Sequence, residues 1–176
     1  DLHTVLDLVR FIPRRYLDYT NPQLISQIKP KQTVSFKATL GFPKTFFTKT
    51  GKLITEVVAE DQTGQIKLVW FNNPYLKKII KPGSSYTVAG LSSLFANRLC
   101  LVSPTIEEGN GFSLNTQGLV PVYPQTAGLK SPFLRKKIFE TLNCIEITDP
   151  LTKLDLSPNY LELSKAYYQI HFPQDK

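Results

Sequence analysis

Alternation of apolar and polar residues is the clearest pattern in the first two thirds of the chain. Between Thr33 and Thr39, Val34, Phe36 and Ala38 alternate with polar residues, which is typical of a strand with one buried face. Residues 42–52 contain a proline near one end and a Thr-Gly pair near the other, which predicts a strand end followed by an exposed hairpin loop. The predicted strands cover residues 33–39, 53–60, 66–71, 85–91 and 99–102.

A short helix is expected between the third and fourth strands. Asn72 and Asn73 are good N-cap residues, and Pro74 suits the first helical position. The helix therefore covers residues 75–80. This order of elements predicts a mainly β fold: a five-stranded OB-fold barrel with a short helix between strands 3 and 4. Another small barrel or sandwich is the alternative.

Helices are expected on both sides of the barrel. Thr4 and Asp7 form a capping box that begins a helix over residues 4–12. Ser131 and Ser157, each followed by a proline, predict helices over 131–145 and 157–169, while residues 118–124 are extended. The predicted division is 1–28 for a helical lead-in, 29–107 for the barrel, and 108–176 for a linker and helical extension.

The strand over residues 66–71 ends in two neighbouring aromatic residues. Neighbours on a strand face opposite ways, so only one of Trp70 and Phe71 belongs to the core. Lys67 shares a face with Phe71 and indicates that this face is solvated, which predicts that Trp70 is buried and Phe71 exposed. Tyr75 follows the bend, where it either is exposed or packs under the helix.

Charge is distributed unevenly along the 176 residues. The net charge is +7; residues 1–100 carry 14 Lys and Arg against 6 Asp and Glu, whereas residues 101–176 carry 7 against 8. A basic first part favours a polyanionic partner such as nucleic acid, and simple solubility is the alternative. Cations interleaved with aromatic rings suit phosphates and bases. The candidate contacts are Phe71 and Tyr75 for stacking and, less strongly, Arg14, Arg15, Lys44, Phe46, Phe47, Lys49, Lys52, Lys67, Lys77, Lys78, Phe95 and Arg98.

Sequence signatures of catalysis are absent. There is no phosphate-binding loop, no nucleophile motif and no Cys-x-x-Cys pair, so neither an enzyme nor a metal site is expected in this chain. Cys100 and Cys144 lie in apolar surroundings, which favours buried, reduced thiols, with one disulfide as the alternative. No apolar run has the roughly 20 residues of a membrane span, and a cytoplasmic location is expected. The chain does not begin with Met and is interpreted as a piece of a longer protein.

Four blocks of the chain resemble one known family. They are Thr4–Leu8 with Pro13–Tyr16, then Asp61–Gly64 with Trp70–Lys78, then Gly118–Pro124 with Thr126 and Gly128–Leu129, and finally Ile170–Pro173. In this order they resemble the N-terminal wedge domain of the RecG family of bacterial ATP-dependent DNA helicases. The match departs at Leu2-His3, where the family often has Gly-Ile, and in the absence of the two motor domains.

The resemblance implies a non-catalytic wedge that binds branched DNA, such as replication forks and Holliday-type junctions, for fork rescue, recombination and repair. It further implies that Phe71 and Tyr75 stack on bases where the arms part. ATP and Mg²⁺ are expected only in the motor domains, which are the second expected partner, and the chain is expected to be a monomer. Two alternatives stay open: a stand-alone OB-fold module for single-stranded DNA or RNA, and an OB domain that binds proteins.

Overall fold

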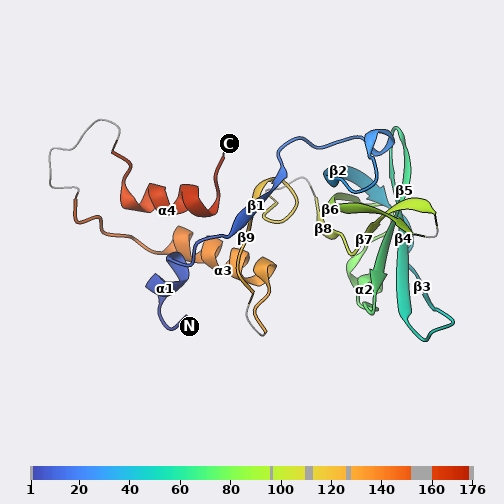
Figure 1. Ribbon diagram of the computed structural model, residues 1–176, viewed down its shortest axis with the longest axis horizontal. Helices are drawn as coiled ribbons and strands as arrows, with labels where there is room; N and C mark the ends of the chain where they lie inside the picture. Colours follow the sequence, from blue (N-terminus) through green and yellow to red (C-terminus); the bar gives the residue numbers. More distant parts are fainter. Residues whose placement is uncertain (1, 96, 110–112, 126–127, 152–159, 175–176) are drawn as a thin grey trace. The chain divides into compact units, whose positions relative to one another are not determined.

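The chain folds into two compact units, each described separately. The computed structural model covers residues 1–176 and describes 2–95, 97–109, 113–125, 128–151 and 160–174. A helical unit combines Asp1–Leu17 with Leu119–Lys176, and a barrel unit consists of Asp18–Gly118 (Figure 1). These units differ from the predicted boundaries at residues 28/29 and 107/108, because the two ends of the chain pack together and residues 18–28 and 108–118 belong with the barrel.

The barrel unit is built around a closed ring of five strands. The ring runs β2 (Thr33–Leu40), β4 (Leu53–Asp61), β5 (Gly64–Phe71), β7 (Arg98–Val102) and β6 (Ser85–Phe95), and β6 pairs again with β2. Only the β5–β7 pairing is parallel; the other pairs of the ring are antiparallel. In chain order this ring reads 1-2-3-5-4-1, the connectivity of an OB-fold, with helix α2 (Leu76–Ile79) between strands 3 and 4. The predicted fold class is confirmed.

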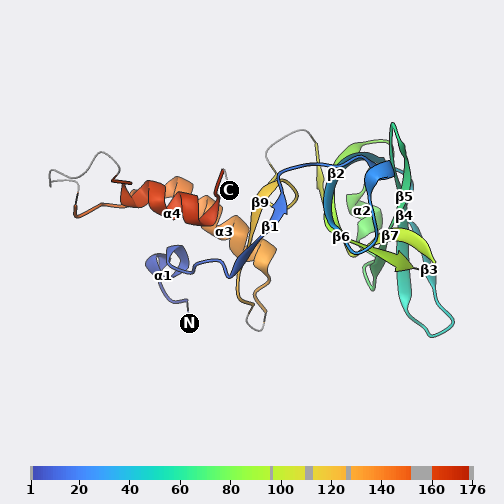
Figure 2. The same ribbon diagram turned by 45° about the horizontal axis from the view of Figure 1, so that its top comes forward.

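Further elements extend this ring. β3 (Lys44–Phe47) pairs with β4, so much of the predicted loop over residues 42–52 is a strand, and the β3–β4 hairpin projects from the ring in both views (Figures 1 and 2). β8 (Thr105–Glu108), which the sequence did not reveal, pairs with β6. The fourth predicted strand continues to Phe95 instead of ending at residue 91.

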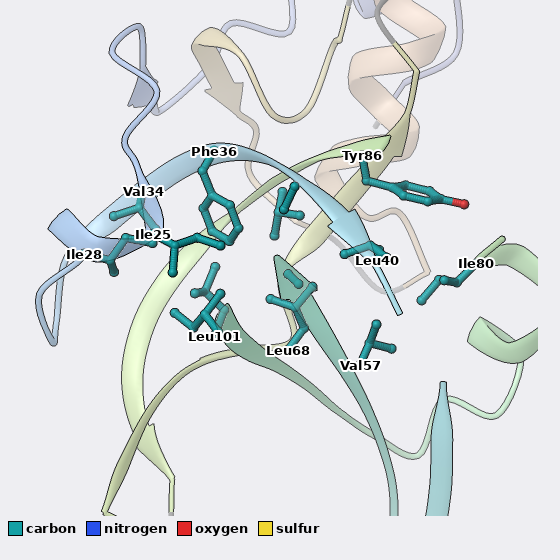
Figure 3. Close-up of a cluster of buried hydrophobic side chains, with 14 of the residues drawn as sticks. Ile25, Ile28, Val34, Phe36, Leu40, Val57, Leu68, Ile80, Tyr86 and Leu101 are labelled. Atoms are coloured by element: carbon teal, nitrogen blue, oxygen red, sulfur yellow. The ribbon is translucent and has the colours of Figure 1, made fainter. Parts of the chain in front are cut away.

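The inward faces of the ring strands form one hydrophobic core. Phe36, Leu68 and Leu101 are fully buried in one cluster, to which Val57 and Tyr86 also belong (Figure 3). Burying such side chains contributes about 1.5–3 kcal/mol each before the entropic cost of folding is counted. This core fixes which face of every ring strand points outward.

A turn between β4 and β5 anchors the segment that leads into the barrel. Asp61 Oδ1 accepts hydrogen bonds from the backbone of Thr63 and Gly64 at 2.7 and 3.0 Å, and Oδ2 accepts from the backbone of Ile25 at 2.8 Å. Ile25 begins the 3₁₀ helix η1 (Ile25–Gln27), whose first residue is buried in the core. Burial opposes ionisation of Asp61, but these hydrogen bonds outweigh it, and the pKa of the carboxyl lies below its ordinary 3.8.

The outer side of β2, β6 and β8 is covered by the chain itself. We call this surface the covered face: Ser35, Thr87, Ala89 and Glu107, with Asn115 and Thr116 lying on it. Ser35 Oγ donates to the carbonyl of Thr116 at 2.5 Å. Glu107 accepts from Asn115 Nδ2 at 2.6 Å and from Thr116 Oγ1 at 2.7 Å. Thr116 is consequently fully buried.

Among its described residues, the helical unit contains three helices and a pair of strands. Helices α1 (Val5–Val9) and α4 (Leu163–His171) each contact α3 (Ser131–Cys144), and β1 (Arg15–Tyr19) pairs with β9 (Gly118–Val122) (Figure 1). The predicted capping box of Thr4 and Asp7 is confirmed. β1 was not predicted from the sequence.

Of the other two predicted helix caps, the one at Ser131 is wrong, and the one at Ser157 lies outside the described residues. Lys130, rather than Ser131, is the N-cap of α3, because Ser131 Oγ accepts the backbone N–H of Tyr123 at 3.1 Å. The fourth helix begins at Leu163, later than predicted, and Ser157 and Pro158 lie outside the described residues. Both cysteines are free; Cys100 is buried as predicted, whereas Cys144 is exposed at the end of α3, so the prediction of burial is wrong there.

A buried histidine joins three distant parts of the helical unit. His171 Nε2 lies 2.7 Å from the carbonyl of Val9, which can only accept, so Nε2 carries the proton. His171 Nδ1 then accepts from the hydroxyl of Tyr123 at 2.8 Å. Burial lowers the pKa of His171 below its ordinary 6.5, against a smaller opposing effect of the Val9 carbonyl. This neutral histidine therefore stabilises the packing of the two chain ends.

Candidate nucleic-acid interface

A sharp bend follows the last residue of β5 and shapes one corner of the barrel unit. Asn72 adopts a left-handed conformation with φ of 53°, and its backbone N–H donates to the carbonyl of Leu53 at 2.9 Å. Asparagine tolerates this conformation better than most residues. The predicted Asn72-Asn73 cap is wrong: Tyr75 occupies the N-cap position of α2, no side chain caps it, and Pro74 precedes the helix. The bend comes from the backbone of Asn72 instead.

Two aromatic rings flank this bend. Phe71 is 37% exposed and Tyr75 is 68% exposed, whereas Trp70 is only 5% exposed. Trp70 Nε1 donates to the carbonyl of Pro104 at 2.9 Å, which satisfies its only donor inside the fold. The predicted burial of Trp70 and exposure of Phe71 are confirmed, and Tyr75 projects outward rather than packing under α2.

The register of the strands brings several candidates onto one surface. Phe46, Ile54 and Phe71 are successive cross-strand partners, and residues that lie opposite each other share a face of the sheet. The same alignment continues from Lys67 to Cys100 across the parallel pair. We call this outward surface of β3, β4, β5, β7 and β6 the open face. Its residues are Lys44, Phe46, Ile54, Glu56, Val58, Lys67, Val69, Phe71, Phe95, Arg98 and Cys100.

The centre of the open face is apolar. Val69, Ile54 and Cys100 form a small cluster that is at most 2% exposed, and Phe95 packs against it. The prediction that the whole face of Lys67 is solvated is therefore wrong at Val69, because β6 and β7 carry apolar side chains across it. Burial is the main cause that raises the pKa of the Cys100 thiol, and the nearby Glu56 carboxylate adds to it, which keeps the thiol neutral.

Aromatic and charged groups surround this centre. The rings of Phe71 and Phe95 meet edge to face with their centroids 6.1 Å apart. Lys67 Nζ lies 3.1 Å from Glu56 Oε2. Arg98 and Lys44 are exposed at the edges of the face. The open face thus combines an apolar floor, ring edges and cations, as single-strand binding surfaces do.

The remaining candidates lie on three other surfaces. Phe47 is 72% exposed but points to the side of the β3–β4 hairpin opposite the open face, because its neighbour Phe46 lies on that face, and Lys49 and Lys52 are exposed in the hairpin turn. Lys77 and Lys78 are exposed on α2, close in sequence to Tyr75. Lys81, just beyond α2, forms an ion pair with Glu108 at 2.9 Å.

Arg14 and Arg15 belong to the helical unit. Both are exposed at the start of β1, where the backbone N–H of Arg14 donates to the carbonyl of Val122 at 2.9 Å. The structure therefore groups these arginines with the β1–β9 pair and not with the barrel candidates.

Sequence reasoning missed Glu56 and Cys100 as members of the open face. The signal was available for Glu56, because the tight turn at Asp61–Gly64 fixes the β4–β5 register and thereby places Glu56 opposite Val69. No such signal was available for Cys100, because the parallel pairing of β5 with β7 depends on closure of the barrel.

The described residues contain no group of three or more His, Cys, Asp or Glu side chains arranged to hold a metal ion. Among the helices described, none has the length and apolar character needed to cross a membrane.

Comparison with known proteins places this geometry in a family. The family model described as the RecG wedge domain matches residues 1–145. The ATP-dependent DNA helicase RecG of Synechocystis sp. is 31% identical over 195 residues, covering 99% of this chain and 23% of the relative. RecG of Staphylococcus aureus is 30% identical over 191 residues, covering 100% of this chain and 26% of the relative.

A solved structure shows the same fold. The structure of RecG bound to a three-way DNA junction matches with a TM-score of 0.79 and 24% identity, over 99% of this chain and 24% of that one. The chain thus spans about a quarter of the length of the relatives it matches. It belongs to the RecG wedge domain family.

Proposed function

We propose that this chain binds branched DNA, such as replication forks and Holliday-type junctions. It acts as the non-catalytic wedge of an ATP-dependent DNA helicase in fork rescue, recombination and repair. Family membership supports the role of a wedge, and the solved relative bound to a three-way junction supports a branched substrate.

The observation that carries the proposal is the corner formed by Phe71 and Tyr75. Phe71 ends a strand whose preceding residues, Leu68, Val69 and Trp70, are buried, so its backbone is held firmly. Tyr75 lies beyond the bend and is the more exposed ring. Two outward rings on a rigid edge can stack on bases that have lost their partners, and one stacked base contributes about 1–3 kcal/mol.

Cations near the corner suit the phosphates of the same DNA. Lys77 and Lys78 follow Tyr75 on α2, and Lys49 and Lys52 lie in the turn of the β3–β4 hairpin. Phosphate contacts position the DNA without reading its sequence, which fits a protein that must act at branches of any sequence.

Binding measured by fluorescence anisotropy tests the proposal. We expect Phe71→Ala and Tyr75→Ala each to weaken binding to a three-way fork by roughly 5-fold to 150-fold, with a much smaller effect on plain duplex. Phe133→Ala is the matched control, because Phe133 is an exposed phenylalanine on α3 of the helical unit. Equal losses on fork and duplex would contradict a role at the branch point.

The remaining parts of the proposal concern the whole protein. ATP and Mg²⁺ act in motor domains outside this chain, which itself needs no cofactor. The wedge works as a monomer joined to those motor domains, in the cytoplasm. A preference for single strands over forks would favour the alternative of a stand-alone OB-fold module, and binding that is insensitive to salt would favour a protein partner.

A further inference from the structure

A hollow of about 280 Å³ opens on the open face beside the corner. Its floor is formed by Val69 and Cys100, which are 0% and 2% exposed. The complete lining is Glu56, Lys67, Val69, Phe95, Arg98 and Cys100. Its volume lies just below the range for ligand sites, roughly 300–1,000 Å³, so it suits one flat ring system rather than a large ligand.

The polar side of the hollow offers an acceptor and a donor next to each other. Glu56 Oε2 is engaged by Lys67 Nζ at 3.1 Å, while in the described part of the chain no hydrogen bond reaches Glu56 Oε1. A carboxylate only accepts hydrogen bonds, and an ammonium group only donates them. The pair therefore matches a ring that presents a donor and an acceptor side by side.

The Watson–Crick edge of a nucleobase has this character, whichever base is present. Bases in a duplex use that edge for their partner, so only an unpaired base can offer it. Phosphate does not fit the same position, because the Glu56 carboxylate would repel it at short range. The exposed Arg98 guanidinium beside the hollow can instead stack on the base or meet the phosphate that follows it.

Phe95 connects this hollow to the corner. Its ring lines the hollow and also contacts the ring of Phe71 edge to face. The hollow therefore lies directly beside Phe71 on the open face. A second hollow of about 90 Å³ borders the same ion pair and includes Phe42 and Lys44, which extends the surface along β4.

We propose that the hollow between Glu56–Lys67 and Phe95–Arg98 holds the first unpaired base of a parted strand by its Watson–Crick edge. The site selects unpaired over paired bases without selecting a sequence. The proposal rests on the proposed binding of branched DNA and assigns a place on the protein to one nucleotide of it.

Two acidic residues in comparable ion pairs provide the test. Glu56 pairs with Lys67 on the open face, and Glu108 pairs with Lys81 elsewhere on the barrel at 2.9 Å. Replacing either by alanine raises the net charge by the same amount, so non-specific attraction to DNA changes equally. In anisotropy titrations with a fork that carries a single-stranded arm, we expect Glu56→Ala to weaken binding about fivefold relative to Glu108→Ala.

An abasic nucleotide at the first unpaired position of that arm completes the experiment. It should weaken the wild-type protein similarly and remove the difference between the two variants. Glu56→Gln keeps an acceptor and the size of the side chain, so it should show an intermediate loss and covers the case in which Glu56→Ala does not fold.

The contradicting outcomes are distinct. If Glu56→Ala binds as well as Glu108→Ala, or if the abasic fork still distinguishes them, the base site is wrong while fork binding stands. If the wild-type protein does not prefer a fork to duplex, the proposed function itself fails, and the base site fails with it.

Discussion

The covered face and the open face are two outer surfaces of the same sheet, and each carries a partly buried glutamate. On the covered face, Glu107 accepts hydrogen bonds from Asn115 and Thr116 of its own chain. On the open face, Glu56 has one ion pair with Lys67, and a hollow lies beside it. On the covered face, the glutamate carboxylate is therefore hydrogen-bonded by the chain's own residues. On the open face, the carboxylate keeps hydrogen-bonding capacity that a ligand can use.

The difference follows from what each surface contains. The covered face buries Ser35, Thr87 and Ala89, and buried polar groups need hydrogen-bond partners, which the segment through Thr116 supplies in part. The open face has an apolar floor, yet Phe46 and Phe71 remain 44% and 37% exposed. Aromatic rings left in water around an apolar centre indicate a surface adapted to bind something flat.

The largest expected effect contrasts the two glutamates in stability. Glu107→Ala should lower the free energy of unfolding by about 2 kcal/mol, because it leaves donors of Asn115 and Thr116 without their charged acceptor. Glu56→Ala should cost at most about 1 kcal/mol, since it removes one partly exposed ion pair. Urea denaturation followed by circular dichroism measures both, and equal losses would remove the distinction between the faces.

A third carboxylate, Asp61, makes the stability of the barrel unit depend on pH. Its folded pKa lies below 3.8, so its stabilising contribution is complete above that value and is lost as pH falls through the lower folded pKa. We expect Asp61→Asn to cost about 1 kcal/mol at neutral pH and to flatten the acid side of the curve. Thermal melts between about pH 5 and pH 2 record this; an unchanged slope in the variant would show that the turn does not depend on the charge.

The smallest expected effect separates cations by position. Lys44→Gln and Lys49→Gln should each reduce the dependence of log K on log salt by about one, the value for one phosphate contact. Lys37 is an exposed lysine on β2, aligned with Thr87 of the covered face, and Lys37→Gln is the matched control. Fork titrations at several salt concentrations measure the slopes. The same slope for Lys44→Gln and the control would indicate that the lysines act only through net charge.

Local patterns predicted much of this architecture. Period-two alternation revealed the five ring strands, and the alternation of Trp70 and Phe71 separated the core ring from the exposed one. Two strands that depend on distant pairing were missed: β1, which pairs with β9, is five residues long, and β8, which pairs with β6, is four residues long. Such short strands gain their stability from partners far away in sequence.

In the candidate site too, the features that depend on distant strand pairing could not be predicted from the sequence. Phe71 and Tyr75 were found from alternation and from the bend, although the bend arises from the left-handed Asn72 and not from a helix cap. The hollow required both the β4–β5 register and the parallel β5–β7 pairing, of which only the first can be read from a turn. The exposure of Cys144 could not be judged from its apolar neighbours in the sequence. Cys144 is the last residue of α3, where one side of the helix faces solvent.

Amide chemical shifts of the isotope-labelled protein, recorded while a three-way DNA junction is added, test the central claim most directly. The account predicts that the shifts that change belong to the corner and the open face, including Lys67, Val69, Phe71 and Tyr75. The amide chemical shifts of Thr87, Ala89 and Thr116 on the covered face should not change. Changes concentrated on the covered face, with the corner unaffected, would contradict the account.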